Sequence, residues 1–416
     1  MKEAVADSSL AVLAGAGAAM RPVAPSGTLP WYCFAIVLAA ACIPLGVLWD
    51  ISWHQTIGRD TFWTPAHMLI YLGGTVPGLI CGWLALKTTF FGTEAERAAS
   101  VRFWGLRAPL GAWVTIWGAV AMLTSAPLDD WWHNAYGLDV EILSPPHTVL
   151  AIGMGAVAVG AWLLMASWQN RMPEGQHQTG GLLFVAISGI FLTMVTIMYT
   201  EKSYPNHQHG AEFYTLSCAT YPYILIAVAR AARHRWPATL SALIYSAILL
   251  AMLWILPLFR AHPKLGPIYT PVDHMVPPTF PLLFIVPAVA IDLFFMLMKK
   301  LDLLKHWSAK WWINSLVNSL IDWGSAVVLG VVFLLLFLPT HWWSSRFLLS
   351  PTADNWIFAS RTHWAYFAQQ SGWQDRYWGV EKDPLTWSAI LLALLFGVLS
   401  SRLGLWIGGG MARVKR

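Results

Sequence analysis

Two sets of carboxylate and imidazole side chains in the first half of the chain have the residue types that hold a metal ion. The first set is Asp50, His54 and His67. Asp50 and His54 are four residues apart, so one helix would place both side chains on the same face. His67 follows Pro65, which suits the first turn of a helix, so a second helix would return this imidazole to the pair. One carboxylate and two imidazoles suit copper, iron or zinc.

The chain repeats this plan with Asp129, His133 and His147. Asp129 and His133 are again four residues apart, and His147 again follows proline, at positions 145 and 146. A single Asp–His pair at a helix end is as often a structural cap as a metal ligand. Because the whole set occurs twice in one chain, we interpret both sets as metal sites.

Other polar residues near these sets are expected to support them. Asp60 follows Arg59, and we expect the two to form an ion pair that shapes the connection between the helices. Asp130, Asp139 and Glu141 are expected to orient the imidazoles of the second set through hydrogen bonds.

A His-x-His pair, His207 and His209, lies in a later connection. An extended segment would place both rings on the same side, where they could bind copper. A polar loop that binds no metal is the alternative for this pair.

Composition places these residues in a membrane protein. The chain is 57% hydrophobic and 11% charged, which is too apolar for ordinary water-soluble domains. The four cysteines include no CxxC pair, so they form no zinc or redox motif of that kind. The formal charge of +5 comes from short basic clusters between apolar runs, which indicates membrane topology rather than nucleic-acid binding. The lipid bilayer is therefore an expected partner.

About ten apolar runs have roughly the 20 residues needed to cross a hydrocarbon core. They lie near residues 31–49, 66–88, 109–126, 147–168, 180–200, 213–230, 238–259, 279–298, 313–339 and 386–409. The expected fold is therefore all-α, a polytopic integral membrane protein. We expect a flexible N-terminal tail at 1–30, a four-helix region with the duplicated motif at 31–170, and an additional six-helix region at 171–416.

The positions of the basic residues predict the topology. Clusters around Arg97, Arg233, Lys300 and Arg413 all follow even-numbered runs. By the positive-inside rule that side is cytoplasmic, so both termini are expected inside the cell. Both metal sets then face the periplasmic or outer side of the inner or plasma membrane.

The letters around the first set resemble a known signature. They read Trp53-His54-Gln55-Thr56-Ile57-Gly58-Arg59-Asp60, with Thr64-Pro65-Ala66-His67 following. Over residues 31–170 the chain is similar to the C subunit of the copper membrane monooxygenases, the particulate methane and ammonia monooxygenase family. In that family an Asp and two His at this spacing bind copper, which implies copper at Asp50, His54 and His67.

The resemblance extends to the second set by spacing. A second site of the family, Asn-x3-His with a later His, corresponds to Asp129, His133 and His147, with Asp in place of Asn. Residues 171–416 extend beyond a usual C subunit. By resemblance the chain would be a monooxygenase or a subunit of one. It would use O₂ to hydroxylate a small substrate, with Asp50, His54 and His67 as the catalytic ligands, and would assemble with other subunits or with itself.

Other functions fit the same ligands. The main alternative is a non-catalytic copper-binding, storage or transport membrane protein. An Asp-His-His set also suits a zinc hydrolase. A membrane di-iron hydroxylase is disfavoured, because such proteins resemble His-rich clusters that face the cytoplasm.

Overall fold

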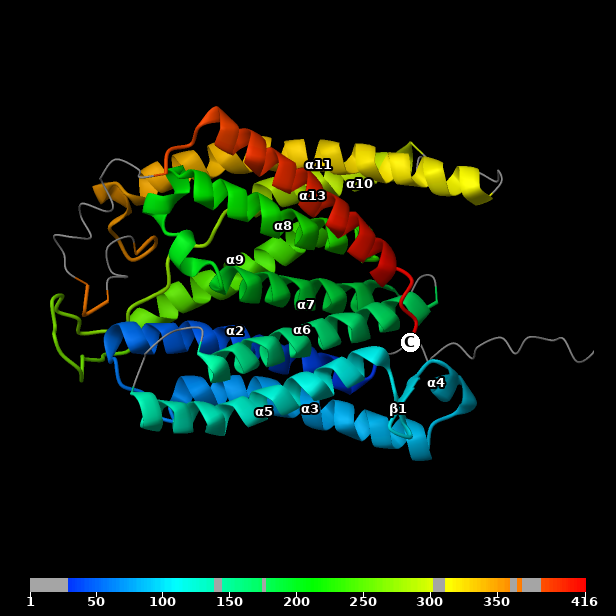
Figure 1. Ribbon diagram of the computed structural model, residues 1–416, viewed down its shortest axis with the longest axis horizontal. Coiled ribbons are helices and arrows are strands. Elements are labelled where there is room, and N and C mark those ends of the chain that lie inside the picture. The colour runs from blue at the N-terminus through cyan, green and yellow to red at the C-terminus, as the bar shows by residue number, and fades with distance from the viewer. Residues whose placement is uncertain (1–28, 138–143, 174–176, 302–310, 360–364, 369–382) are drawn as a thin grey trace, which may run out of the picture.

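The protein is described from a computed structural model, which is almost wholly helical (Figure 1). The structure describes residues 29–137, 144–173, 177–301, 311–359, 365–368 and 383–416. The N-terminal tail expected at 1–30 lies almost entirely outside the described residues, as do Asp139 and Glu141.

Long helices follow one another along the chain, with short connections between most of them. They are α2 (Trp31–Thr56), α3 (Pro65–Phe90), α5 (Leu110–Tyr136), α6 (Pro145–Arg171), α7 (His177–Ile197), α8 (Ala211–Ala231), α9 (Pro237–Ile255), α10 (Ile285–Lys300), α11 (Trp311–Leu348) and α13 (Trp387–Met411). The shorter elements are α4 (Glu94–Ala98), the antiparallel pair β1 (Val101–Phe103) and β2 (Leu106–Ala108), and the 3-10 turns η1 (Thr200–Lys202), η2 (Pro205–His209), η3 (Leu256–Leu258) and η4 (Pro351–Ala353).

In the described part of the chain, eight helices are long and apolar enough to cross a membrane. They confirm a polytopic all-α protein, but not the expected number of about ten. The two remaining predicted runs form α8 and α10. With 16 residues, α10 is shorter than the roughly 20 residues of a typical span. Helix α8 carries polar residues along its length and packs most closely against α13.

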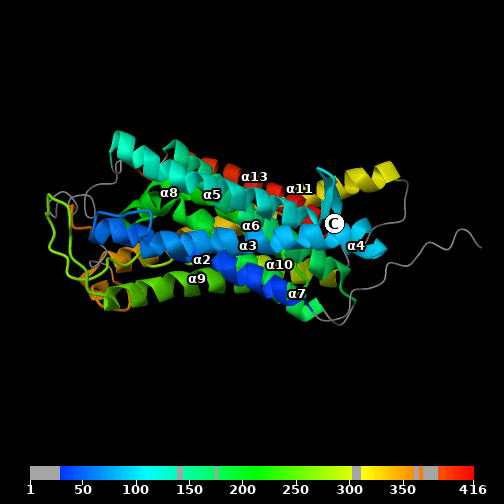
Figure 2. The ribbon, with the colours of Figure 1, turned by 90° about the horizontal axis from the view of Figure 1, so that it is seen from below.

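The long helices run side by side along the longest dimension of the molecule (Figures 1 and 2). One group consists of α2, α3, α5 and α6, and a second consists of α8, α10, α11 and α13, with α7 and α9 between them. The start of α2 and the C-terminus lie at the same end of the bundle as α4. The end of α2, the start of α3, the end of α5 and the start of α6 lie at the opposite end, so the fold brings both Asp–His sets to one end.

Glycines determine how the helices of the first group are offset from one another along their axes. A Cβ on Gly46 of α2 would lie 2.6 Å from Ile70 Cγ1 of α3, and a Cβ on Gly118 of α5 would lie 2.6 Å from the Val157 nitrogen of α6. Small residues of this kind allow helix backbones to approach closely within a membrane. The close approach fixes how far the end of α2 extends past the start of α3, and likewise for α5 and α6.

Candidate metal centres

The first cluster forms where α2 ends and α3 begins. Helix α2 continues through Asp50 and His54, and Pro65 occupies the first position of α3, two residues before His67. His67 Nε2 lies 3.1 Å from Asp50 Oδ1, and His54 Nε2 lies 3.8 Å from Asp50 Oδ2. The structure therefore brings together the three side chains that the sequence singled out.

A fourth side chain, Asp60, joins this cluster from the connecting loop. Its Oδ2 lies 3.4 Å from His67 Nε2 and 3.6 Å from His54 Nε2. The sequence analysis assigned Asp60 to an ion pair with Arg59, whereas the structure directs its carboxylate to the two imidazoles. The side chain of Asp60 is only 12% exposed, so it is part of the cluster and not of the surface.

The loop conformation accounts for the position of Asp60. Gly58 has a φ of +82°, which turns the chain just after α2. The Trp53 indole then donates to the Arg59 carbonyl over 2.8 Å, and this bond folds the loop back over the helix. The Thr61 amide donates to Thr64 Oγ1 and closes the loop before α3. No spacing rule in the sequence indicates this return of the chain.

The two neighbouring imidazoles affect the pKa of Asp60. Burial raises the pKa of its carboxyl, but the hydrogen bond with His54 and the charges of His54 and His67 outweigh burial, so the pKa is lowered overall. The carboxylate form is therefore favoured, which is the form that binds a cation.

The hydrogen bond of His67 to a backbone carbonyl shows which of its ring nitrogens is available to bind a metal ion. Its Nδ1 lies 2.9 Å from the Thr61 carbonyl, which can only accept, so Nδ1 carries a proton. In a neutral ring Nε2 then has a bare lone pair, and it points at the carboxylate oxygens of Asp50 and Asp60. A lone pair that faces a carboxylate is repulsive, so Nε2 requires either a second proton or a metal ion between it and the oxygens. A hydrogen bond from the other ring nitrogen to a backbone carbonyl is typical of histidines that bind metal.

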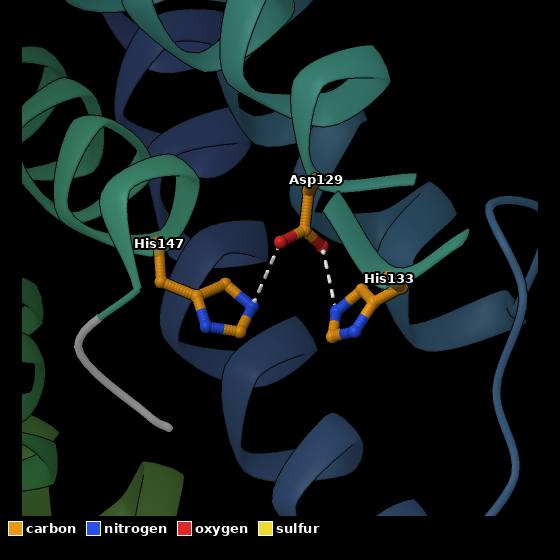
Figure 3. Close-up of side chains that lie close together, drawn as sticks. All are labelled: Asp129, His133 and His147. Atoms are coloured by element: carbon orange, nitrogen blue, oxygen red, sulfur yellow. Dashed lines mark ion pairs between the residues drawn. The ribbon is translucent and has the colours of Figure 1, made fainter. Parts of the chain in front are cut away.

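The second cluster has the same arrangement between α5 and α6 (Figure 3). Asp129 lies between two imidazoles, with Oδ1 3.2 Å from His147 Nε2 and Oδ2 3.5 Å from His133 Nε2. His133 Nδ1 lies 3.3 Å from the Gly137 carbonyl, which again leaves Nε2 toward the carboxylate. Ser144 caps α6 by accepting from the His147 amide, so His147 is held at the start of the helix.

Residues expected to support the second cluster are placed differently. Asp130 is exposed, and its Oδ2 lies 3.4 Å from the side-chain nitrogen of Asn134. Within the described part of the chain, Asp130 contacts Asn134 and neither imidazole. Asp139 and Glu141 lie in the segment that the structure does not describe.

In each cluster the donor atoms lie near one another, as ligands of one metal ion would. Atoms that share an ion at about 2.0–2.2 Å stand roughly 3–3.6 Å apart. In each cluster three donor atoms lie within 4.8 Å of one another: from Asp50, Asp60 and His67 in the first, and from Asp129, His133 and His147 in the second. His54 lies beside the first of these groups.

Each cluster also contains a buried oxygen that needs a partner. Asp50 Oδ1 and Asp129 Oδ1 are inaccessible to solvent and accept no hydrogen bond, although each lies 3.1–3.2 Å from an imidazole nitrogen. Buried polar atoms are rarely left unpaired. A proton on the facing imidazole nitrogen or a metal ion could satisfy each oxygen, and a metal ion would bind the imidazole nitrogen as well.

Residues from the second half of the chain hold the first cluster's loop. The segment 264–276 and Tyr366 reach the end of α2 through three hydrogen bonds. They run from the Lys264 amide to the Ile57 carbonyl (2.9 Å), from the Tyr366 amide to the Gln55 carbonyl (3.0 Å), and from the Val276 amide to Thr56 Oγ1 (2.8 Å). A Cβ on Gly58 would clash with the Tyr366 hydroxyl. The additional region therefore braces the loop that carries Asp60.

The His207/His209 pair does not form a comparable group in the described residues. His209 Nε2 lies 3.0 Å from Ser345 Oγ and 3.3 Å from the Trp342 carbonyl. Burial lowers the pKa of His209, which favours its neutral form. These contacts support a structural role in joining η2 to α11.

Comparisons with protein-family models, curated proteins and solved structures give no match to this chain. The functional argument therefore rests on the residues and geometry of the two clusters.

Proposed function

We propose that the protein is an integral membrane copper protein similar to the C subunit of the copper membrane monooxygenases, and that it takes part in O₂-dependent hydroxylation of a small substrate. The observation that carries this proposal is the pair of buried carboxylate oxygens, Asp50 Oδ1 and Asp129 Oδ1. Each lies beside an imidazole nitrogen and accepts no hydrogen bond. The letter-specific resemblance around His54 supplies the choice of copper.

The residues of the first cluster have separable roles in this proposal. His67 and His54 would donate Nε2 lone pairs to the metal, and the Thr61 carbonyl fixes the ring of His67. Asp50 and Asp60 would supply negative charge. Bound copper would supply the capacity to bind and reduce O₂.

Aromatic residues beside the first cluster contribute unequally to excluding water. Phe62 packs on Tyr71 with ring centroids 5.2 Å apart, and Tyr71 in turn lies 6.2 Å from the His67 ring. These rings shield His67 on one side. Trp63 is 71% exposed and is better suited to the membrane interface.

We further propose that both clusters face the periplasmic or outer side. Both lie at the end of the bundle opposite to the C-terminus (Figure 1), and the basic clusters of the sequence accompany the C-terminal end. The positive-inside rule makes that end cytoplasmic. In this arrangement α8 and α10 also cross the bilayer within the bundle, and other monooxygenase subunits or further copies of the chain would pack against it.

Metal analysis of the purified protein in detergent, prepared anaerobically, tests the proposal. We expect one copper ion per cluster. The His67→Ala and His147→Ala variants should each lose one ion, and His54→Ala should weaken copper binding at the first cluster. His274→Ala is the matched control at the same end of the molecule, since His274 pairs with the exposed Asp273 outside both clusters.

Oxygen uptake with small hydrocarbons and amines tests the catalytic part. Activity in the parent protein that is lost in His67→Ala and His54→Ala supports hydroxylation. Copper binding without oxygen-dependent activity would favour a storage or transport protein. Unchanged copper content in a His67→Ala/His147→Ala double variant would overturn the assignment of both clusters.

A further inference from the structure

Among the described residues the first cluster has one carboxylate more than the second, and this difference should affect which metal ion each cluster prefers. We infer that Asp60 makes the first cluster selective for a divalent ion over Cu⁺, relative to the second cluster. This inference rests on the proposed function, because it requires that both clusters bind metal.

The geometry places Asp60 among the donors of the first cluster. Its Oδ2 forms a compact group with Asp50 and His67, and lies 3.4 Å from His67 Nε2. At the second cluster Asp129 is the carboxylate that the described residues bring to the imidazoles. Asp130 beside it is exposed and turned to Asn134.

Charge balance then differs between the clusters. With neutral imidazoles, the carboxylates of Asp50 and Asp60 carry a charge of −2, whereas Asp129 carries −1. A divalent ion neutralises the two carboxylates of the first cluster, and Cu⁺ neutralises the one carboxylate that the described residues bring to the second. The side chains involved are mostly buried, at 12% to 32% exposed, so uncompensated charge is costly there.

The hardness of the carboxylate donors also favours a divalent ion at the first cluster. Carboxylate oxygen is a hard donor that suits divalent ions, whereas Cu⁺ prefers soft donors. A second carboxylate should therefore weaken Cu⁺ binding relative to Zn²⁺. Because the bonds of Trp53 and Thr61 hold the loop, Asp60 is placed for the ion before the ion arrives.

Competition between Zn²⁺ and Cu⁺ tests the inference in single-cluster variants. His147→Ala retains the first cluster, and His67→Ala retains the second. Each metal-free protein is titrated in detergent with Zn²⁺ and, anaerobically with a reductant, with Cu⁺ against a chelator of known affinity. We expect the ratio of Zn²⁺ to Cu⁺ affinity to be at least about tenfold higher at the first cluster.

Substitution of Asp60 identifies the cause. In the His147→Ala background, Asp60→Asn should lower the ratio by about tenfold, and Asp60→Glu, which keeps the charge, should restore most of it. In the His67→Ala background, Asp130→Asn should leave the ratio unchanged. Copper retained at the second cluster of the single Asp60→Asn variant shows that the protein is still folded.

The outcomes separate this inference from the proposal it rests on. Metal binding by the first cluster with an unchanged ratio in Asp60→Asn, or equal ratios at the two clusters, would overturn the role of Asp60 and leave the metal sites intact. Failure of the His147→Ala protein to bind either ion would overturn the first cluster as a metal site altogether.

Discussion

The first and second clusters share a plan but are supported by different parts of the molecule. The second is built on the last turns of α5 and the first turn of α6, with Ser144 as the cap. The first also receives hydrogen bonds from Lys264, Val276 and Tyr366. Among the described residues, the cluster that the second half of the chain supports is also the one with an additional carboxylate. Two sets with the same spacing in the sequence therefore have different surroundings in the fold, because contacts with distant residues reach only one of them.

The largest expected difference between the two clusters is the loss of metal affinity when Asp129 or Asp50, the carboxylate beside both imidazoles, is removed. Asp129→Ala takes away the anionic donor that the described residues bring to the second cluster, so metal affinity there should fall by more than about 100-fold. Asp50→Ala leaves Asp60 in the first cluster, and the loss should be about 10-fold to 100-fold. Isothermal titration with Zn²⁺ measures both. Equal losses in the two variants would show that Asp60 does not act as a donor.

A substitution at Gly58 should lower metal affinity at the first cluster alone, because only that cluster is supported by the second half of the chain. Gly58→Ala adds about 1–2 kcal/mol of strain at a positive φ and places a methyl group against the Tyr366 hydroxyl. We expect metal affinity of the first cluster to fall by about tenfold and that of the second to stay unchanged.

Gly105→Ala is the matched control for this change. Gly105 has the same φ of +82°, but a Cβ there meets nothing within 4 Å. It should cost a similar strain without altering either cluster. If Gly105→Ala lowers metal affinity at the first cluster as much as Gly58→Ala does, the contact with Tyr366 does not support that cluster.

Loss of the hydrogen bond from Val276 to Thr56 is a milder test of the support that the second half of the chain gives to the first cluster. Thr56→Val keeps the shape of the side chain but leaves the buried Val276 amide without its acceptor, which should cost about 1–2 kcal/mol of stability. Thr124→Val in α5 is the control, since Thr124 Oγ1 bonds only to carbonyls of its own helix. Thermal unfolding in detergent should show a lower midpoint for Thr56→Val than for Thr124→Val. Equal midpoints would contradict this role.

The smallest expected effect is a pH dependence at Asp60 in the metal-free protein. Its pKa is lowered in the folded state, so its ionised form stabilises the fold above its unfolded pKa of about 3.9. That contribution is lost as the pH falls through the folded pKa. The difference in unfolding midpoint between the parent and Asp60→Asn should therefore be present at pH 5 to 6 and shrink below about pH 4. A constant difference over that range would contradict the prediction.

Local patterns predicted much of the fold and most of each cluster. The four-residue interval from Asp50 to His54 and the proline before His67 were enough to predict a helix end and a helix start that meet. Asp60 was assigned wrongly, because its position depends on a turn at Gly58 and on contacts with Tyr366, far away in the chain. Periodicity and spacing describe neighbours along a helix, and neither describes a loop held by distant residues.

The start of α10 shows the same limit. Apolar length predicted α10 as a span near 279–298, but the helix begins only at Ile285. Residues 281–284 instead form part of an irregular segment in which the Leu282 amide donates to the Tyr245 hydroxyl and the Leu283 amide to His341 Nε2. These acceptors lie on other helices, so the sequence near 279 could not reveal that the helix would start late.

The brace on the first cluster has a consequence for the order of events during synthesis. Everything that positions Asp129, His133 and His147 in the described structure is present once α6 has entered the membrane. The end of α2, which leads into the loop of Asp60, acquires its hydrogen bond from Tyr366 only when that residue has been synthesised, long after α6. Contacts between residues so distant in the chain form late, after local helix pairs have assembled. If both clusters bind metal as proposed, we expect the second cluster to take up its ion before the first, in the reverse of their order along the chain.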